Sequence, residues 1–470
     1  MSDPQIAIIG GGPAGLTAAF ELAKHGAAGT IIEADSVVGG ISRTEERDGY
    51  RFDIGGHRFF TKAAEVQTLW DEILPGKMMT RPRLSRIFYD GKFYDYPLNA
   101  RNALFNMGFT TAAACMISYG LAKAHPISNP RNFEEWVTNQ FGAKLYGMFF
   151  KAYTEKVWGI PCSEIGADWA AQRIKGLSLG EAVRNAIFGQ KSGKVVKTLI
   201  DEFRYPPFGP GQLWQACADA VVERGWTLVK NTSVKSVIVE NGHVTGLRAT
   251  QPDGTDIDIA CSHVFSSMPL RELVCGIDGV PDDVAAAARS LKYRDFLTVS
   301  LVLDAESLFP DNWIYIHSPE VNLGRIQNFK NWSPKMVPDQ SKTCLGLEYF
   351  CNEGDDVWRS PDDKLVEMAY KELSQINLAG GSLDKGYVVR MPKAYPVYDT
   401  GYSERLSTII NWVKSIEGLY CVGRNGQHRY NNMDHSMMTS VIAVRSLVTG
   451  EKLDPWSVNE DAEYHETSRQ

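Results

Sequence analysis

Apolar positions near the N-terminus change their spacing twice. An apolar run from Ile6 to Ile9 ends at Gly10, a segment with helical periodicity runs from Ala14 to His25, and a second apolar run leads to Glu33. Side chains repeat every two residues along a strand and every 3.6 residues along a helix. The order therefore predicts a strand, a tight turn, a helix and a second strand.

The next part of the chain begins with β-type patterns and then becomes helical. Alternating residues from Tyr50 lead into Gly55-Gly56, which predicts a strand that ends in a turn with an exposed backbone. The stretch Leu84–Pro97 predicts a hairpin, with Asp90-Gly91 as the turn between aromatic-rich arms. A helical block is expected from 100 to 175, and Asn132 has the residue type and position of a helix cap within it.

The second half alternates loops, strands and helices. The Pro- and Gly-rich stretch Arg204–Trp214 predicts an irregular, rigid loop that enters a helix from Gln212 to Arg224. A series of strands is expected from Trp226 to Phe265, and its last strand, His263–Phe265, is expected to rejoin the first sheet. The further predicted elements are strands at Leu297–Asp304, Asn312–His317 and Cys344–Cys351 and a helix at Asp362–Gln375.

The C-terminal pattern predicts another strand, loop and helix. The apolar segment that begins at Gly418 is followed by a polar loop and by a helix that is capped by Asp434 and runs to about Thr449. Such a helix N-terminus is able to face a ligand, although an ordinary connection between a strand and a helix has the same pattern.

Composition and charge narrow the possible functions. A chain of 470 residues fits two or three domains, and its net charge of −7 argues against a nucleic-acid partner. The eight cysteines are dispersed without a C-x-x-C motif or metal-ligand spacing, so we expect reduced cysteines, no metal site and a cytoplasmic protein. Because the first strand begins at Gln5, we expect no signal peptide.

One uncharged segment raises the question of a membrane. No charged residue occurs from Asn102 to Ala122, and the segment 103–121 is long enough to span a bilayer. Its threonines, glycines and other polar residues make it only moderately apolar. A buried or partner-facing helix is the favoured interpretation, and contact with a membrane surface is the alternative.

The first turn carries the clearest chemical signal. In the motif Gly10-x-Gly12-x-x-Gly15, the first glycine allows the turn, the second lets the backbone approach a pyrophosphate, and the third lets helix and strand pack closely. The helix N-terminus supplies free N–H groups, and Glu33 is placed to accept a hydrogen bond from a ribose hydroxyl. This unit is predicted to bind a dinucleotide.

Several stretches together resemble known flavoproteins. The glycine turn with Glu33, the pair Gly39-Gly40 before Arg43, the strand Thr232–Val237 and Gly423-Arg424 resemble the FAD-binding framework of amine-oxidase and protoporphyrinogen-oxidase-like flavoproteins. Within this group the chain resembles UDP-galactopyranose mutases most, especially the eukaryotic form. That likeness is carried by Tyr50–His57, Asn132–Trp136, Lys156–Pro161, Asn331–Pro334 and Gly423–Ser436.

The resemblance implies an α/β fold. It comprises a Rossmann-type FAD-binding domain, an inserted helical domain and an antiparallel β-sheet substrate domain. The implied boundaries are 1–80, 208–285 and 400–450 for the FAD-binding domain, 100–205 for the helical domain, 81–99 and 286–399 for the substrate domain, and 451–470 for a C-terminal tail.

The resemblance also implies noncovalent FAD. The glycine turn would hold its diphosphate, Glu33 its adenosine ribose and the backbone of Val234 its adenine, while His57 would lie beside the isoalloxazine and the Met437 N–H at flavin O2. The full implied set is Gly10, Gly12, Gly15, Glu33, Gly40, Arg43, Gly56, His57, Val234, Gly423, Arg424, Asp434 and Met437.

In the mutases, N5 of the reduced flavin attacks the anomeric carbon of a nucleotide-linked sugar, which then recloses in the other ring size. The departing diphosphate needs a cation where its charge develops. In family register that cation is Arg325, and Tyr315, Tyr395 and Tyr430 match phosphate-binding tyrosines. The implied catalytic residues are His57 and Arg325, and NADPH or NADH is a candidate flavin reductant.

Two departures from the family pattern leave the substrate open. Pro97-Leu98-Asn99 stands where eukaryotic mutases have a glutamine near the uracil, and Arg58-Phe59-Phe60 replaces the usual apolar continuation after His57. The expected partner is a small sugar nucleotide or a related molecule, and no oligomeric state is predicted. The alternatives are a flavin oxidoreductase acting on an amine, sugar or polyene, and a nucleotide-binding scaffold without catalysis.

Overall fold

The computed structural model describes residues 5–96, 100–167 and 202–458. A parallel five-stranded sheet, in the order β19-β13-β1-β2-β9, carries the N-terminal turn. Its strands are β1 (Ile6–Ile9), β2 (Gly29–Ile32), β9 (Thr227–Val229), β13 (His263–Ser266) and β19 (Leu419–Cys421). Three helices pack together beside it: α1 (Pro13–Lys24), α10 (Gly211–Glu223) and α18 (Met433–Thr449). The predicted strand–turn–helix–strand unit and the return of His263–Phe265 to the first sheet are confirmed.

A second, mostly antiparallel sheet has seven strands in the order β18-β14-β17-β16-β15-β6-β7. They are β6 (Ser85–Tyr89), β7 (Lys92–Asp95), β14 (Tyr293–Leu303), β15 (Trp313–Ile316), β16 (Arg325–Asn328), β17 (Thr343–Cys351) and β18 (Leu383–Pro396). The predicted hairpin is present as β6 and β7, and helix α15 (Asp362–Gln375) has the expected bounds and packs against β14 and β18. Buried Leu297, Leu347 and Leu365 belong to the apolar core between this sheet and α15.

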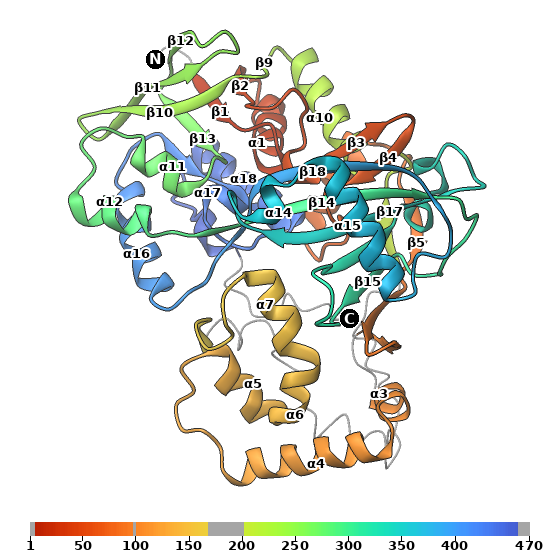
Figure 1. Cartoon of the computed structure of the whole chain (residues 1–470). Coiled ribbons are helices and arrows are strands. Elements are labelled where there is room, and N and C mark those ends of the chain that lie inside the picture. The colour runs from red at the N-terminus through yellow and green to blue at the C-terminus, as the bar shows by residue number, and fades with distance from the viewer. Residues whose placement is uncertain (1–4, 97–99, 168–201, 459–470) are drawn as a thin grey trace.

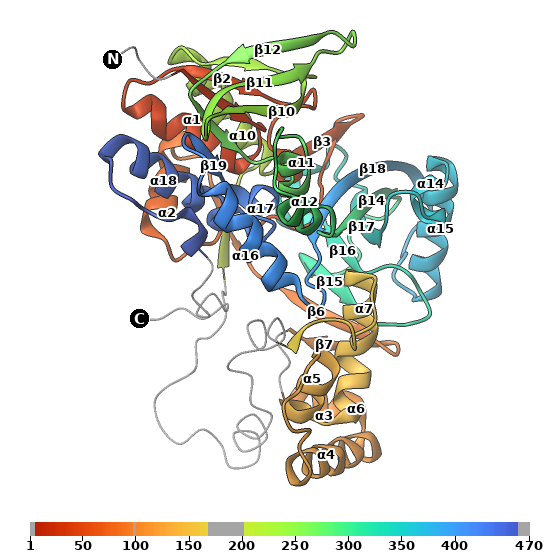
Figure 2. The same ribbon diagram turned by 90° about the vertical axis from the view of Figure 1, so that its left-hand side faces the viewer.

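A helical part extends away from the two sheets (Figures 1 and 2). It comprises α3 (Ala100–Met107), α4 (Phe109–Ala124), α5 (Phe133–Phe141), α6 (Ala143–Leu145), a π-helical segment (Tyr146–Lys151) and α7 (Ala152–Trp158). The predicted cap is confirmed because the Asn132 side chain accepts a hydrogen bond from the Glu135 N–H at 2.9 Å. The rest of the predicted helical block, 168–175, lies outside the described residues, as does Pro97-Leu98-Asn99.

Shorter elements connect these three parts. The other strands are β3 (Thr44–Arg47), β4 (Tyr50–Asp53), β5 (Met79–Pro82), β8 (Glu202–Tyr205), β10 (Ser233–Glu240), β11 (His243–Thr250) and β12 (Asp256–Ala260). The other helices are α2 (Ala64–Ile73), α11 (Leu270–Cys275), α12 (Asp282–Arg289), α13 (Phe329–Trp332), α14 (Asp356–Arg359), α16 (Tyr402–Val413) and α17 (Gly423–Gly426). Short 3₁₀ turns lie at Gly40–Ser42, Pro334–Met336 and Pro455–Ser457.

The observed architecture is the predicted mixed α/β fold with a Rossmann-like part and antiparallel sheets. The exact domain boundaries stay a prediction. All eight cysteines are free thiols, as expected.

Three local predictions are wrong. Arg204 and Tyr205 lie in β8, paired with β5, because the extended residues before the Pro-Pro turn have a partner that is distant in sequence. Asp434 does not cap α18: Asn432 is the cap, in a reciprocal arrangement with His435, and Asp434 lies in the first turn. The segment 103–121 is not one continuous helix, since Gly108, with φ of 78°, separates α3 from α4. Within the described ranges, the helices are too short or too polar to cross a membrane.

Candidate functional site

The first turn places glycines and an acid side by side. Gly10 has φ of 98°, and a Cβ on Gly15 would lie only 1.9 Å from the Gly10 carbonyl oxygen, so α1 and β1 approach closely. At the end of β2, Glu33 accepts hydrogen bonds from the N–H groups of Gly11 (2.5 Å) and Asp35 (2.8 Å). Burial raises the pKa of Glu33, while these two hydrogen bonds lower it.

Two glycines form a cradle at the start of α1. A Cβ on Gly12 would lie 3.7 Å from the Gly40 Cα, and one on Gly40 would lie 3.4 Å from the Gly12 Cα. No side chain caps the N-terminus of α1 at Gly12, which leaves its first N–H groups for another acceptor. The bare backbone and the positive end of the helix suit a pyrophosphate. These residues therefore fit the diphosphate of a dinucleotide such as FAD.

The C-terminal strand and helix meet the same turn. A Cβ on Gly423 would lie 2.7 Å from the Ala14 Cβ, and the Ser440 hydroxyl donates to the Ala14 carbonyl at 2.8 Å. The N-terminal parts of α17 and α18 are thus held against the start of α1. Asp434 and Met437 are buried in the first turns of α18.

Two other predicted cofactor residues, Arg43 and Val234, lie around this centre. Arg43 pairs with Glu45 (2.6 Å) and Asp35 (3.0 Å), next to the Gly40 turn. Val234 lies in β10, just after Thr232, whose N–H donates to the Glu33 carbonyl at 3.0 Å. The predicted cofactor residues are therefore brought to one end of the parallel sheet, although their roles stay predictions.

An open groove of about 490 Å³ borders Arg43 on the side of α10. Its lining carries both signs of charge: Arg43, Arg51 and Lys77 are opposed by Glu46 and Asp219. This groove is separate from the cluster around Arg325 described next, because none of its lining residues belongs to the seven-stranded sheet.

Tyr315, Arg325 and Glu348 form a row across three neighbouring strands. Tyr315 on β15 lies opposite Arg325 on β16, which in turn lies opposite Glu348 on β17. Directly opposed residues share one face of a sheet. The Arg325 guanidinium lies 5.5 Å from the centre of the Tyr315 ring, and its Nε is 3.1 Å from Glu348 Oε2.

The charges of this row are fixed by burial and pairing. Burial alone lowers the pKa of Arg325, but the Glu348 carboxylate raises it well above its usual range, so the guanidinium stays protonated. Burial raises the pKa of Glu348, whereas Arg325 and a hydrogen bond from Gln327 lower it.

The Gly-Gly-His turn contacts the same row. A Cβ on Gly56 would lie 2.8 Å from Gln327 Nε2, and Gln327 donates to Glu348 at 2.7 Å. Burial lowers the pKa of His57 to about 3, and the positive charges of Arg424 and Arg325 contribute to this shift. His57 is therefore a neutral imidazole at neutral pH, and the charges of two guanidinium groups act on it.

Tyr395 and Tyr430 form an aromatic wall near the row. Their rings stack at 5.5 Å, and the Arg424 guanidinium lies 4.7 Å from the Tyr430 ring and 5.6 Å from the Tyr395 ring. Arg424 is held by the carbonyls of Asn431 and Ala394. Trp158 closes the wall with ring distances of 6.4 and 6.2 Å.

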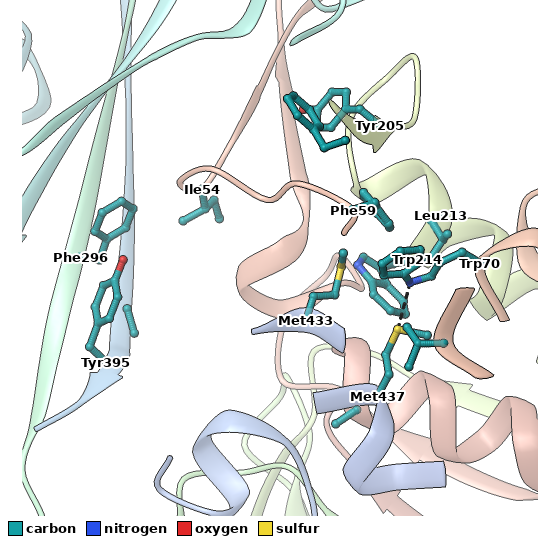
Figure 3. Close-up of a cluster of buried hydrophobic side chains, with 14 of the residues drawn as sticks. Ile54, Phe59, Trp70, Tyr205, Leu213, Trp214, Phe296, Tyr395, Met433 and Met437 are labelled. Atoms are coloured by element: carbon teal, nitrogen blue, oxygen red, sulfur yellow. Dashed lines mark hydrogen bonds between the residues drawn. The ribbon is translucent and has the colours of Figure 1, made fainter. Parts of the chain in front are cut away.

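Ile54 separates Tyr395 of the aromatic wall from Met437 in the first turns of α18. In Figure 3, Ile54 stands between Tyr395 and Phe296 on one side and Met437 on the other. Met437 accepts a hydrogen bond from Trp70 Nε1 through its sulfur at 3.2 Å. The structure thus brings the predicted substrate tyrosines together with Arg325 and Arg424 toward the turn that carries His57.

Several residues of this cluster were not predicted. Glu348 had a signal, because it is the one charge within the otherwise apolar or aromatic stretch Cys344–Cys351. Gln327 and Tyr153 had none, since a polar residue in a short strand and a tyrosine in a helix are common. Tyr153 stacks on His317 at 4.6 Å and contacts Tyr315 at 5.7 Å. Arg58, noted as a departure from the family pattern, lies 5.7 Å from the ring of Trp313 on β15.

Comparisons with known proteins agree with this geometry. Residues 8–73 match the family model of an NAD(P)-binding Rossmann-like domain. A Klebsiella pneumoniae protein described as a probable UDP-galactopyranose mutase is 29% identical over 174 residues, which cover 36% of this chain and 44% of that protein. The chain thus spans less than half the length of the first curated relatives that it matches.

Two solved structures share the fold. Reduced UDP-galactopyranose mutase superposes with a TM-score of 0.84 at 22% identity and covers 98% of this chain and 97% of its own. Putrescine oxidase bound to putrescine gives a TM-score of 0.63 at 16% identity, with 95% and 99% covered. The chain contains an NAD(P)-binding Rossmann-like domain and has the fold that UDP-galactopyranose mutase shares with amine oxidases.

Proposed function

We propose that this protein is a FAD-dependent enzyme that acts on a nucleotide-linked or otherwise phosphorylated sugar. The observation that carries the proposal is the row Tyr315–Arg325–Glu348, which meets His57 and Tyr395 near the end of the parallel sheet. When bound, reduced FAD would supply N5 as the nucleophile at the anomeric carbon of the sugar. NADPH or NADH is the proposed reductant of the flavin.

In this proposal FAD lies across the two parts of the molecule. Gly12, Gly40 and the start of α1 would hold its diphosphate, and Glu33 would accept from its ribose. The turn at Gly56-His57 and the start of α18 would border its isoalloxazine. His57 is neutral, so it would contact the ring system without adding a charge.

Arg325 would stabilise the departing diphosphate. A protonated guanidinium offers planar donors that match phosphate oxygens, and charge on those oxygens grows as the bond to the sugar breaks. Tyr315 lies beside Arg325, and Tyr395 and Tyr430 lie farther along the same wall, so their hydroxyl groups are proposed to bind the same phosphates. Glu348 and Gln327 would position Arg325 rather than touch the substrate.

The decisive experiment is anaerobic. Chemically reduced and oxidised protein are each incubated with a panel of nucleotide sugars, and the ring forms of the products are separated by chromatography. We expect ring isomers to form with the reduced protein and not with the oxidised protein. Products that form only with oxidised flavin and an electron acceptor would reject the mutase proposal.

A variant of Arg325 can lose stability as well as activity, because its partner Glu348 is fully buried. Removing one partner of a buried ion pair costs about 3–5 kcal/mol of stability, so Arg325→Ala alone would combine an effect on folding with one on chemistry. The double variant Arg325→Met with Glu348→Gln leaves no uncompensated charge and is expected to lose turnover while it retains FAD. The matched control is Arg86→Met with Asp311→Asn, because Arg86 on β6 pairs with the buried Asp311 outside the row.

A second candidate function is a flavin oxidoreductase with net oxidation of an amine, sugar or polyene. Aromatic faces also bind apolar or cationic substrates, and the candidate site contains several of them. The rings of Tyr395 and Tyr430 stack on each other, and Trp158, Phe296 and Phe350 lie beside Tyr395. This candidate requires one equivalent of oxygen or another acceptor for each product, and an oxygen electrode measures that stoichiometry directly.

A further inference from the structure

Helix α4 exposes large apolar side chains. Phe109 is 88% exposed, Ile117 65% and Leu121 60%, and Met116 is also exposed. At 100° per residue these positions lie on one broad side of the helix. Phe105, 87% exposed near the end of α3, extends the same apolar set. We call Phe105, Phe109, Met116, Ile117 and Leu121 the α3–α4 face.

The opposite side of α4 packs against α5 and α6 through small side chains. Ala112 and Cys115 are buried there, and the Ser118 hydroxyl accepts a hydrogen bond from the Lys144 N–H at 3.1 Å. A helix on the surface of a globular protein normally points its apolar stripe inward. In α4 the largest apolar side chains point outward instead, and the described residues do not cover them.

The stretch of sequence that contains the face carries charges of one sign. From Tyr96 to Phe133 the sequence contains no aspartate or glutamate, whereas Arg101, Lys123 and Arg131 occur within it. Lys123 is exposed in the last turn of α4. Cations beside an apolar face complement the negative headgroups of an anionic lipid surface.

The position of α4 suits a flat partner. Figures 1 and 2 show α4 at the end of the helical part that lies farthest from both sheets. A planar surface can reach the α3–α4 face there without meeting the other parts of residues 5–96, 100–167 and 202–458.

We infer that the α3–α4 face docks this protein on an anionic lipid surface. Helix α4 has 16 residues, which gives it a length of about 24 Å, shorter than the roughly 30 Å hydrocarbon core of a bilayer. It would lie in the plane of the interface, with its aromatic and aliphatic side chains among the upper acyl chains and Lys123 at the headgroups.

A second copy of the chain fits this face less well. A helix about 24 Å long and about 10 Å wide offers a footprint of roughly 240 Å². A stable protein–protein interface buries about 800 Å² on each partner. Acyl chains can surround each exposed side chain individually, so a lipid surface buries this convex face more completely.

Docking through α4 would hold the helical part at the membrane and leave the candidate site at the end of this part that faces the two sheets. The hairpin strand β7 leads into α3 and is tied to it, because Lys92 Nζ donates to the Asn106 carbonyl at 2.8 Å. Helix α7, which follows in the same part, carries Tyr153 and Trp158 of the candidate site. The inference does not depend on the proposed reaction.

The test is co-sedimentation of the purified full-length protein with vesicles of phosphatidylcholine alone or mixed with phosphatidylglycerol. We expect binding to the anionic vesicles, weakened by high salt. The double variant Phe109→Ser with Ile117→Ser removes two exposed apolar side chains and should reduce partitioning at least about tenfold. Phe109→Trp should add an emission component that shifts to the blue on binding and is quenched by brominated lipid.

The control is Val222→Ser with Val448→Ser, which changes exposed valines far from the face and should leave partitioning unchanged. Circular dichroism and thermal melting check that each variant is folded. The inference is overturned if the wild-type protein remains in the supernatant, or if the Phe109/Ile117 variant binds as the wild type does. A dimer in analytical ultracentrifugation that this variant dissociates would instead assign the face to a second copy, and would also overturn it.

Discussion

Glu348 determines what Arg325 can contribute. The pair is nearly neutral as a unit, so it attracts a distant anion less than a lone guanidinium would. The pair contributes mainly by orienting Arg325, because Glu348 binds the Arg325 side chain and is itself held by Gln327. The sequence predicted Arg325 only through family register. It could not reveal the buried carboxylate, since opposition across two strands is a property of the sheet register.

At the other end of the site, the Glu33 carboxylate has two hydrogen-bonding roles, one observed and one proposed. Its carboxylate accepts the N–H groups of Gly11 and Asp35, and it is also proposed to accept from the ribose. Glu33→Gln replaces one acceptor oxygen by an NH₂ group, which faces a backbone N–H and leaves it without an acceptor. We expect a loss of about 1–3 kcal/mol in stability and a lower FAD content after purification.

Thermal melting and the flavin-to-protein absorbance ratio measure these two effects. Ser36→Ala is the control, since Ser36 is exposed one residue beyond Asp35 and contacts only that side chain among the interactions found for it. Unchanged FAD content in Glu33→Gln would contradict the assigned role of the carboxylate.

Among the elements, α1 shows best what the sequence can predict. Local periodicity determined its bounds to within a residue, and the glycine spacing predicted the close contact with β1. Elements that depend on distant partners were predicted less well. Strand β8 was assigned to a loop because its pairing with β5 is not visible locally, and α18 was given the wrong cap because Asn432 and Asp434 are both good caps.

Two helical glycines provide a matched comparison. Gly15→Ala would place a methyl group 1.9 Å from the Gly10 carbonyl oxygen, which forces α1 away from β1. Gly120→Ala in α4 meets no atom within 4 Å. We expect Gly15→Ala to lose about 1–3 kcal/mol together with bound FAD, and Gly120→Ala to gain about 0.5–1 kcal/mol. Urea unfolding measures both changes, and equal effects of the two substitutions would refute the packing argument.

Across the whole molecule, burial sets the acid response. Burial lowers the pKa of His57, His317 and His428 to about 3 each, from an ordinary value of 6.5. Between these values the unfolded chain binds protons that the folded chain does not, so the histidines reduce stability as the pH falls from 6.5 toward 3. Asp53 acts in the opposite sense. Burial raises its pKa from 3.8 to about 7, and its contribution to stability is lost as the pH rises through that window.

His428 isolates this effect from the chemistry, because it packs against Tyr293 and Tyr402 and lies outside the Arg325 row. His428→Gln removes one group that is protonated only on unfolding. In acidic solution, the unfolding free energy of the variant should fall less steeply with decreasing pH than that of the wild type, by up to about 1.4 kcal/mol per pH unit.

Urea titrations between pH 6.5 and the acid limit of the folded state measure this slope. The slope does not change if the substitution also causes a loss of packing energy that is the same at every pH. His25→Gln, at an exposed position, is the control substitution. Parallel curves for His428→Gln and the wild type would show that His428 takes up its proton in the folded state.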